Sequence, residues 1–188
     1  MIKEFSLDYL NEIKSVLNDL PLEKFEEIVN LILKAYVEER QIFIMGNGGS
    51  GSTASHFACD INKGVCFGLN KRFKVICLND NIPTMLAYAN DVSYAHIFVE
   101  QLKNFLKPHD LVIGISASGN SENVLRAIHY ANENGAHTIG FTGFDGGKLA
   151  TLAHTSLIVP VNDMQKVEDV HLILTHMLMQ IAHKKLKE

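Results

Sequence analysis

The stretch Gln41-Ile-Phe-Ile-Met-Gly-Asn-Gly-Gly-Ser-Gly-Ser52 decides the fold, because an apolar run typical of a strand passes directly into a glycine- and serine-rich loop. A second stretch of the same kind, Leu111-Val-Ile-Gly-Ile-Ser-Ala-Ser-Gly-Asn-Ser121, follows later in the chain. Glycines let the backbone approach a ligand closely, and serine hydroxyls add donors without adding charge. A loop that enters a helix also directs free N–H groups and the positive end of the helix dipole at one point. Two such loops predict a phosphate site at the carboxyl ends of parallel strands.

Short apolar segments alternate with helical periodicity from residue 41 onward. We expect strands over 41–45, 74–78, 110–115, 137–141 and 155–159. We expect helices over 51–62, 84–90, 93–105, 121–134, 146–152 and 166–184. Strands rich in Val, Ile and Leu between helices indicate an α/β fold with a five-stranded parallel sheet flanked by helices.

Two amphipathic helical patterns on either side of Pro21 precede this unit. They predict an N-terminal helical hairpin over residues 1–38, joined to an α/β sandwich over 39–188 within a single domain. Apolar surface left over on such a hairpin would be buried by oligomerisation.

The overall composition is that of an ordinary globular domain: 188 residues, 47% hydrophobic, with a net charge of −4. Neither this charge nor the short basic cluster at the C-terminal end indicates nucleic acid as a partner. No apolar run approaches the length of a membrane span, and residues 1–30 do not resemble a signal peptide. Three cysteines without a C-x-x-C pair predict buried free thiols in a reducing compartment, so we expect a cytoplasmic protein.

The first loop also matches the dinucleotide fingerprint, as Gly46-x-Gly48-x-x-Gly51. The acidic residue expected at the end of the second strand has only a poor candidate in Asp80, and no Walker lysine follows either loop. A nucleotide-dependent oxidoreductase is therefore the least favoured function. The three serines of the second loop fit a monophosphate, although Ser121 could simply cap the following helix.

Histidines and carboxylates gather on two of the expected helices. His56 and Asp60 lie four residues apart and share one helix face. On the last helix, Glu168 shares a face with His171 and lies within about 80° of His176. These groups suit a divalent metal, above all zinc, or a general acid and base, while spacing alone equally allows ordinary structural histidines.

Taken together, these segments resemble the sugar isomerase (SIS) domain family, and within it the phosphoheptose isomerases, over nearly the whole chain. The resemblance rests on several ordered motifs: Gly46-Asn-Gly-Gly-Ser50, His56-Phe-Ala58, Ala89-Asn-Asp91, Ser116-Ala-Ser-Gly-Asn-Ser121, Asp145-Gly-Gly-Lys-Leu149, and Glu168-Asp-Val-His171 with His176. It implies a homotetramer assembled through the N-terminal helices. It also implies isomerisation of sedoheptulose 7-phosphate to D-glycero-D-manno-heptose 7-phosphate through an enediol, for lipopolysaccharide or other heptose-containing glycans.

The resemblance also implies roles for individual residues. The phosphorylated sugar would contact Asn47, Gly48, Gly49, Ser50, Asn90, Asp91, Ser116, Ala117, Ser118 and Ser121, with the phosphate on the three serines. Zinc would be held by His56, Asp60, Glu168 and His176, the family favouring His176 over His171. Asp60, Glu168 and His176 would be the catalytic groups.

Two positions depart from the family pattern. Asp60 stands where phosphoheptose isomerases have glutamate, and Glu168 stands where they have glutamine. Either Asp60 or Glu168 could act as the base, and the altered pair could serve a different sugar phosphate. The alternative function is a non-catalytic SIS module that binds a sugar phosphate or takes part in regulation or assembly.

Overall fold

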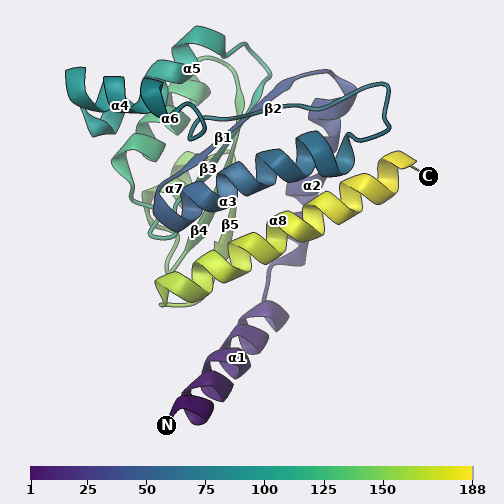
Figure 1. Ribbon diagram of the computed structural model, residues 1–188, viewed down its shortest axis with the longest axis vertical. Coiled ribbons are helices and arrows are strands. Elements are labelled where there is room, and N and C mark those ends of the chain that lie inside the picture. Colours follow the sequence, from purple (N-terminus) through teal and green to yellow (C-terminus); the bar gives the residue numbers. More distant parts are fainter. Residues whose placement is uncertain (188) are drawn as a thin grey trace.

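The computed structural model describes residues 1–187 as a parallel five-stranded sheet with helices on both faces (Figure 1). The strands run in the order β2-β1-β3-β4-β5, and every neighbouring pair is parallel. Their bounds are β1 Gln41–Gly46, β2 Lys74–Cys77, β3 Leu111–Ile115, β4 His137–Gly143 and β5 Thr155–Val159. The predicted fold class is therefore confirmed, with each strand within two residues of its expected bounds.

Alternate side chains of the strands point to opposite faces of the sheet and pack into two separate hydrophobic cores. Ile42 and Ile44 of β1 pack in one core, and Phe43 and Met45 pack in the other, all at most 1% exposed. The first core is closed by α2 Leu22–Val37, α3 Gly48–Cys59 with the π-helical turn Asp60–Val65, and α8 Met164–Lys187. The second is closed by α5 Val99–Phe105, α6 Glu122–Glu133 and α7 Gly147–Leu152. Burial on both faces explains the almost continuous apolar strands.

A segment between β2 and α5 differs from the expected helices. The helix expected over 93–105 is divided into a 3₁₀ turn, Tyr94–His96, and α5. The preceding helix, α4 (Ile82–Asp91), has no buried residue and lies at the margin of the molecule (Figure 1). Pro83 and the Asn81 side chain, which accepts from the Thr84 N–H at 3.2 Å, define its first turn.

The predicted N-terminal hairpin is wrong, although both of its helices exist. α1 (Ile2–Asn18) extends away from the domain, and α2 continues in the same general direction instead of folding back (Figure 1). α1 is held by the start of α8, where the Tyr9 hydroxyl donates to Asp169 at 2.6 Å and Lys166 pairs with Glu12 at 2.6 Å. Its first ten residues leave Phe5, Leu7 and Leu10 exposed. An amphipathic pattern predicts that a face will be buried, and it does not specify the element that buries it.

The three cysteines are free, as expected, and two of them are buried. Burial raises the pKa of the Cys77 thiol to about 12, so this group stays protonated at neutral pH. Cys59 is exposed, contrary to expectation, because it lies on the outer side of α3. Within residues 1–187, no helix is both long and apolar enough to cross a membrane.

His171 joins α8 to the sheet inside the first core. Its side chain is 1% exposed, and its Nε2 lies 3.0 Å from the Thr142 carbonyl oxygen. Since a carbonyl can only accept, Nε2 carries the proton, and Nδ1 is buried with no hydrogen-bond partner among residues 1–187. Burial lowers the pKa of His171 to about 4, so the ring is neutral in the folded protein.

This histidine makes a prediction about stability and pH. Because the folded pKa is lowered, the unfolded chain binds more protons below its own pKa of about 6.5, and stability falls as the pH drops from about 6.5 toward 4. His171 alone should cost about 2 kcal/mol of unfolding free energy between pH 7 and pH 5. Urea unfolding at the two pH values should show this loss reduced by about that amount in His171→Gln, which can still donate to Thr142. An unchanged difference between the two pH values would contradict the assignment.

Candidate functional site

The first glycine loop is the opening turn of α3. β1 ends at Gly46, Asn47 has an extended backbone, and α3 begins at Gly48, three residues earlier than expected. Gly48 has a φ of 52°, which a glycine adopts at no steric cost. The N–H groups of the first turn have no partner within the helix, so they are available to an anion.

A side chain that the motif analysis missed holds this loop in place. Asn79 follows β2, and its side-chain amide makes two hydrogen bonds to the backbone of Gly46. Its Oδ1 accepts from the Gly46 N–H at 3.2 Å, and its Nδ2 donates to the Gly46 carbonyl at 2.8 Å. The available signal was an amide residue directly after the second strand. Asn79 fixes the point at which β1 leaves the sheet.

The second loop joins β3 to α6 and is held from two sides. Gly119 has a φ of 64°, and its carbonyl accepts from the Leu149 N–H at 2.9 Å. The space beside its Cα is filled by the backbone of Gly146, so no side chain fits there. Ala117 accepts from the Gly143 N–H at 2.8 Å. The β4–α7 connection therefore shapes the serine loop.

The serine hydroxyls of this loop are not used as helix caps. Ser121 occupies the N-cap position of α6, but its side chain makes no capping hydrogen bond. The Ser116 hydroxyl donates to the Ser121 hydroxyl at 3.1 Å, while Ser118 accepts weakly from the Asn120 N–H at 3.3 Å. Ser118 also lines an open hollow of about 500 Å³. Ser121 is thus available for more than a structural role.

The two loops meet because their strands are neighbours. β1 and β3 pair directly, with Gly46 opposite Ile115 in the register. The loops therefore start at the same level, at the carboxyl edge of the sheet. In this strand order the connections diverge between β1 and β3, and such a switch point is where open α/β sheets bind ligands.

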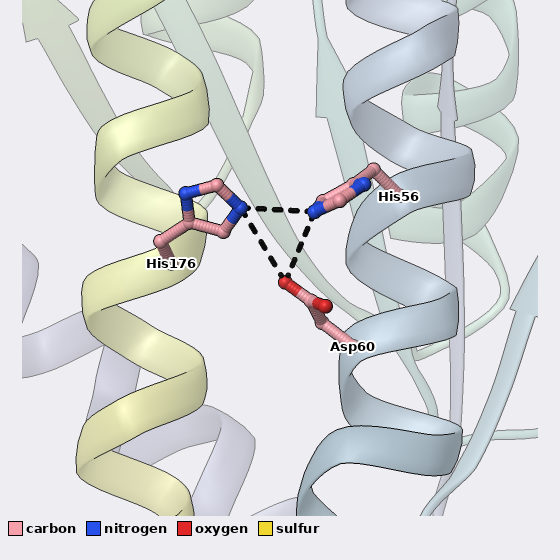
Figure 2. Close-up of side chains that lie close together, drawn as sticks. All are labelled: His56, Asp60 and His176. Carbon is pink, nitrogen blue, oxygen red and sulfur yellow. Dashed lines mark hydrogen bonds and ion pairs between the residues drawn. The ribbon is translucent and has the colours of Figure 1, made fainter.

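Two histidines and an aspartate converge between α3 and α8 (Figure 2). The Nε2 atoms of His56 and His176 lie 2.9 Å apart. Asp60 Oδ2 lies 3.4 Å from the Nε2 of His56 and 3.7 Å from that of His176. α3 and α8 lie side by side in the same layer (Figure 1), and Asp60 begins the π-helical turn that extends α3. Such turns occur frequently at functional sites.

The donor atoms of this cluster fit a divalent cation. Asp60 Oδ2 is buried and makes no hydrogen bond, although it faces two imidazole nitrogens. Two facing imidazoles can share only one proton without repulsion, and a cation accepts lone pairs from both nitrogens and from the carboxylate together. Two imidazoles and a carboxylate form a ligand set used by catalytic zinc sites. His56, Asp60 and His176 are therefore the residues that could hold a metal.

Glu168, predicted as a further ligand, lies outside this cluster. Its half-buried carboxylate fills the space beside the Cα of Gly49, at the start of α3. A carboxylate is stabilised near a helix N-terminus by the dipole and the free N–H groups. The structure thus brings Glu168 to the first loop, and its role as a metal ligand stays a prediction.

Of the other predicted site residues, some lie at the two loops and others lie apart from them. Ser50 is buried in the first turn of α3, within the loop. Asn90 and Asp91 lie at the exposed end of α4, where the Asn90 amide donates to Asp91 at 2.8 Å, and they are not joined to the metal cluster. His171 is a buried structural residue, so His176 is the histidine of α8 that reaches the cluster.

The structure adds two side chains that sequence patterns did not identify. Asn123 of α6 and Tyr94 of the 3₁₀ turn both contact the Asn47 side chain, at 2.9 Å and 2.8 Å. Neither stands in a recognisable motif for chemistry. Their partner is distant in the sequence, so only the fold shows the contact.

Comparison with known proteins agrees with this architecture. The family model for the SIS domain matches residues 8–143. A phosphoheptose isomerase from Clostridium acetobutylicum is 36% identical over 88% of this chain and 84% of its own length. One from Aliarcobacter butzleri is 36% identical over 99% of this chain and 97% of its own length.

Solved structures agree as well. The phosphoheptose isomerase GmhA from Neisseria gonorrhoeae superposes with a TM-score of 0.90 at 26% identity, covering 98% of this chain and 100% of that one. The family model spans well over half of the chain, and the relatives align over nearly all of it. The chain therefore belongs to the SIS domain family, in the group of the phosphoheptose isomerases.

Proposed function

We propose that this protein is an aldose–ketose isomerase that converts sedoheptulose 7-phosphate to D-glycero-D-manno-heptose 7-phosphate. The proposal rests on one observation: a loop suited to an anion and the His–Asp–His cluster are both built on α3. This helix opens with the first loop, carries His56 and is followed directly by Asp60. We place the phosphate of the sugar on the second loop, which lies beside the first, and the reacting carbons toward the cluster. The relatives named phosphoheptose isomerase support the same substrate.

Binding and positioning come from the two loops. Ser116, Ser118 and Ser121 would hold the phosphate together with the free N–H groups at the start of α6. Asn47, Gly48 and Gly49 would contact the sugar. Binding energy gained far from the reacting carbons is used to orient them, which accelerates the chemical step.

The reaction moves one proton between two carbons and one between two oxygens. A carboxylate removes a proton from C1 of the ketose and returns it to C2, while the hydroxyl proton moves between O1 and O2. His56, Asp60 and His176 would hold zinc, which when bound would polarise the sugar carbonyl. Because the Nε2 of His176 would be bound to zinc, the oxygen proton would pass directly between O1 and O2, which are neighbouring oxygens of the sugar.

We assign the carbon proton to Glu168. Asp60 Oδ2 faces the two imidazoles, which is the position of a metal ligand. The Glu168 carboxylate lies against Gly49, where the sugar is expected. The longer side chain at position 168 thus compensates for the shorter one at position 60.

The first prediction concerns activity. Zinc-loaded protein incubated with sedoheptulose 7-phosphate should form an aldoheptose 7-phosphate, observed by NMR of the sugar. Asp60→Ala should lose both zinc and turnover, whereas Asp80→Ala should keep both, since Asp80 lies outside the His–Asp–His cluster and its side chain accepts from Ser55 at 2.6 Å. No turnover by the wild type at high enzyme concentration would favour a non-catalytic sugar-phosphate-binding module.

The Glu168 variant completes this experiment. Glu168→Gln should bind zinc normally but turn over about 10² to 10⁴ times more slowly, the usual contribution of a general base. Metal content measured by atomic absorption separates loss of the base from loss of zinc. Retained activity in Glu168→Gln would assign the proton transfer to Asp60 instead.

A second prediction concerns the serine loop. Ser118→Ala combined with Ser121→Ala should raise the KM for the sugar phosphate about a hundredfold or more, because each hydrogen bond to a charged group contributes about 1.5–3 kcal/mol. Initial rates at several substrate concentrations give the KM. Ser156→Ala is the matched control, since its hydroxyl is buried in β5 without a partner. An unchanged KM in the double variant would remove the phosphate assignment.

We also propose that the protein is a cytoplasmic homotetramer assembled through its N-terminal helices. α1 projects from the domain (Figure 1) and exposes Ile2, Phe5 and Leu10 at 82%, 70% and 62%. An apolar helix in this position is stabilised by burial against other copies of the chain.

The assembly gives a third prediction. Phe5→Glu with Leu10→Glu should lower the molar mass measured by light scattering after size exclusion from that of a tetramer to that of a smaller species. Glu4→Gln with Asp8→Asn, polar exchanges on the same helix, should leave the mass unchanged. A wild-type protein that is monomeric at micromolar concentration would contradict the proposal.

A further inference from the structure

Asn123 connects the first loop (residues 46–52) and the second loop (residues 116–121), called here the ligand loops, through a pair of side-chain amides. It is the second residue of α6, and its side chain is 2% exposed. Its Nδ2 donates to Asn47 Oδ1 at 2.9 Å, and Asn47 Nδ2 donates back to Asn123 Oδ1 at 2.9 Å. Asn47 belongs to the first loop, and Asn123 stands two residues after Ser121, the last residue of the second loop. The pair is therefore a direct side-chain connection between them.

The orientation of both amides is fixed by a backbone group. Asn123 Oδ1 lies 3.0 Å from the Val124 nitrogen, and a backbone N–H can only donate. The atom at that position must therefore be the carbonyl oxygen, which leaves Nδ2 of Asn123 to face Asn47. A donor at that point requires the oxygen of Asn47 opposite it. The Asn47 amide is thus held in one of its two flipped orientations.

Tyr94 completes the set of partners around Asn47. Its hydroxyl donates to Asn47 Oδ1 at 2.8 Å. Together with the bond from Asn123, this fills both lone pairs of that oxygen. Asn47 Nδ2 has used one of its two N–H groups, and the other meets no acceptor within residues 1–187. The side chain can therefore offer a ligand a donor only.

We propose that Asn123 is a positioning residue that makes Asn47 a hydrogen-bond donor to an oxygen of the bound sugar phosphate. The inference rests on the proposed function, in which Asn47 contacts the sugar. A fixed N–H donor favours an oxygen acceptor, and above all an oxygen on which negative charge develops during enediol formation. A freely rotating amide would present its carbonyl part of the time and would repel such an oxygen.

The test is a double-mutant cycle with Asn47. Asn123→Ser should lower kcat/KM for sedoheptulose 7-phosphate about ten- to a hundredfold, the scale expected for a misplaced contact group. In an Asn47→Ala background the same substitution should change kcat/KM by less than about twofold, because the group it orients is gone. Equal factors in both backgrounds would overturn the proposal and leave Asn123 a purely structural residue.

Two further variants guard against effects of stability. Asn132→Ser is the control, because it removes a hydrogen-bonded side-chain amide from the other end of α6. Asn132 donates to the Leu152 carbonyl at 2.8 Å and accepts from the Thr138 hydroxyl at 2.7 Å. It should lower the melting temperature without coupling to Asn47. Tyr94→Phe removes only the third hydrogen bond, from an exposed side chain, and should cost a few-fold in kcat/KM. If Asn123→Ser does not fold, the cycle is run with Asn123→Asp, which can still accept from the Val124 N–H but cannot donate to Asn47, and independence from Asn47 again overturns the proposal.

The orientation can be read without any turnover. In ¹⁵N-labelled protein, the Asn47 side-chain amide proton that is bonded to Asn123 Oδ1 should be shifted downfield and should exchange with water more slowly than in Asn123→Ser. Asn47 side-chain protons with the same shifts and exchange rates in the wild type and in Asn123→Ser would refute the fixed orientation, whatever the activity. A wild type that neither binds nor converts the heptose phosphate, yet shows the shifted and protected proton, would refute the proposed function alone.

Discussion

The pairing of β1 with β3 is the contact on which the candidate site depends. Because Gly46 lies opposite Ile115, the residues that follow them leave the sheet side by side at its carboxyl edge. This places Asn47 within reach of the α6 start and allows the amide pair with Asn123 to form. A slip of one residue along the strand would turn each β1 side chain toward the opposite core. The apolar residues that build the cores therefore also fix the position of the ligand loops.

The second element that the site needs is the contact between α3 and α8. His56 and Asp60 are brought together by helical spacing, but His176 reaches them only because α8 packs along α3 in the layer that closes the first core (Figure 1). Buried residues on α8, such as Val167, Leu174 and Leu178, hold this packing. The His–Asp–His cluster is thus a product of core packing, and loops contribute none of its three side chains. A site on packed helices holds its groups more precisely than one on mobile loops.

The strands and both ligand loops could be predicted because their signals are local: apolar runs, glycines and serines within a few residues of each other. What could not be predicted depends on distant partners. The side of α1 that contacts α8 is set by Tyr9 and Glu12, which meet Asp169 and Lys166 more than 150 residues away. Periodicity showed that α1 is amphipathic and left its partner open. Asn123 and its role escaped prediction for the same reason, since an asparagine near a helix start is usually a local turn residue.

The second carboxylate that this chain carries at position 168 is consistent with the separate locations of the Asp60 and Glu168 side chains. If both carboxylates lay in one cluster with two imidazoles, their mutual repulsion would favour protonation of one of them at neutral pH. Glu168 instead lies at the N-terminus of α3, where the helix dipole and free N–H groups stabilise its charge. Asp60, with a buried oxygen that lacks a hydrogen bond, bears the cost of desolvation without full compensation from the protein. A cation at the His–Asp–His cluster would supply that compensation. Asp60 therefore remains suited to holding a metal, and the position of Glu168 is consistent with the substrate role proposed for it.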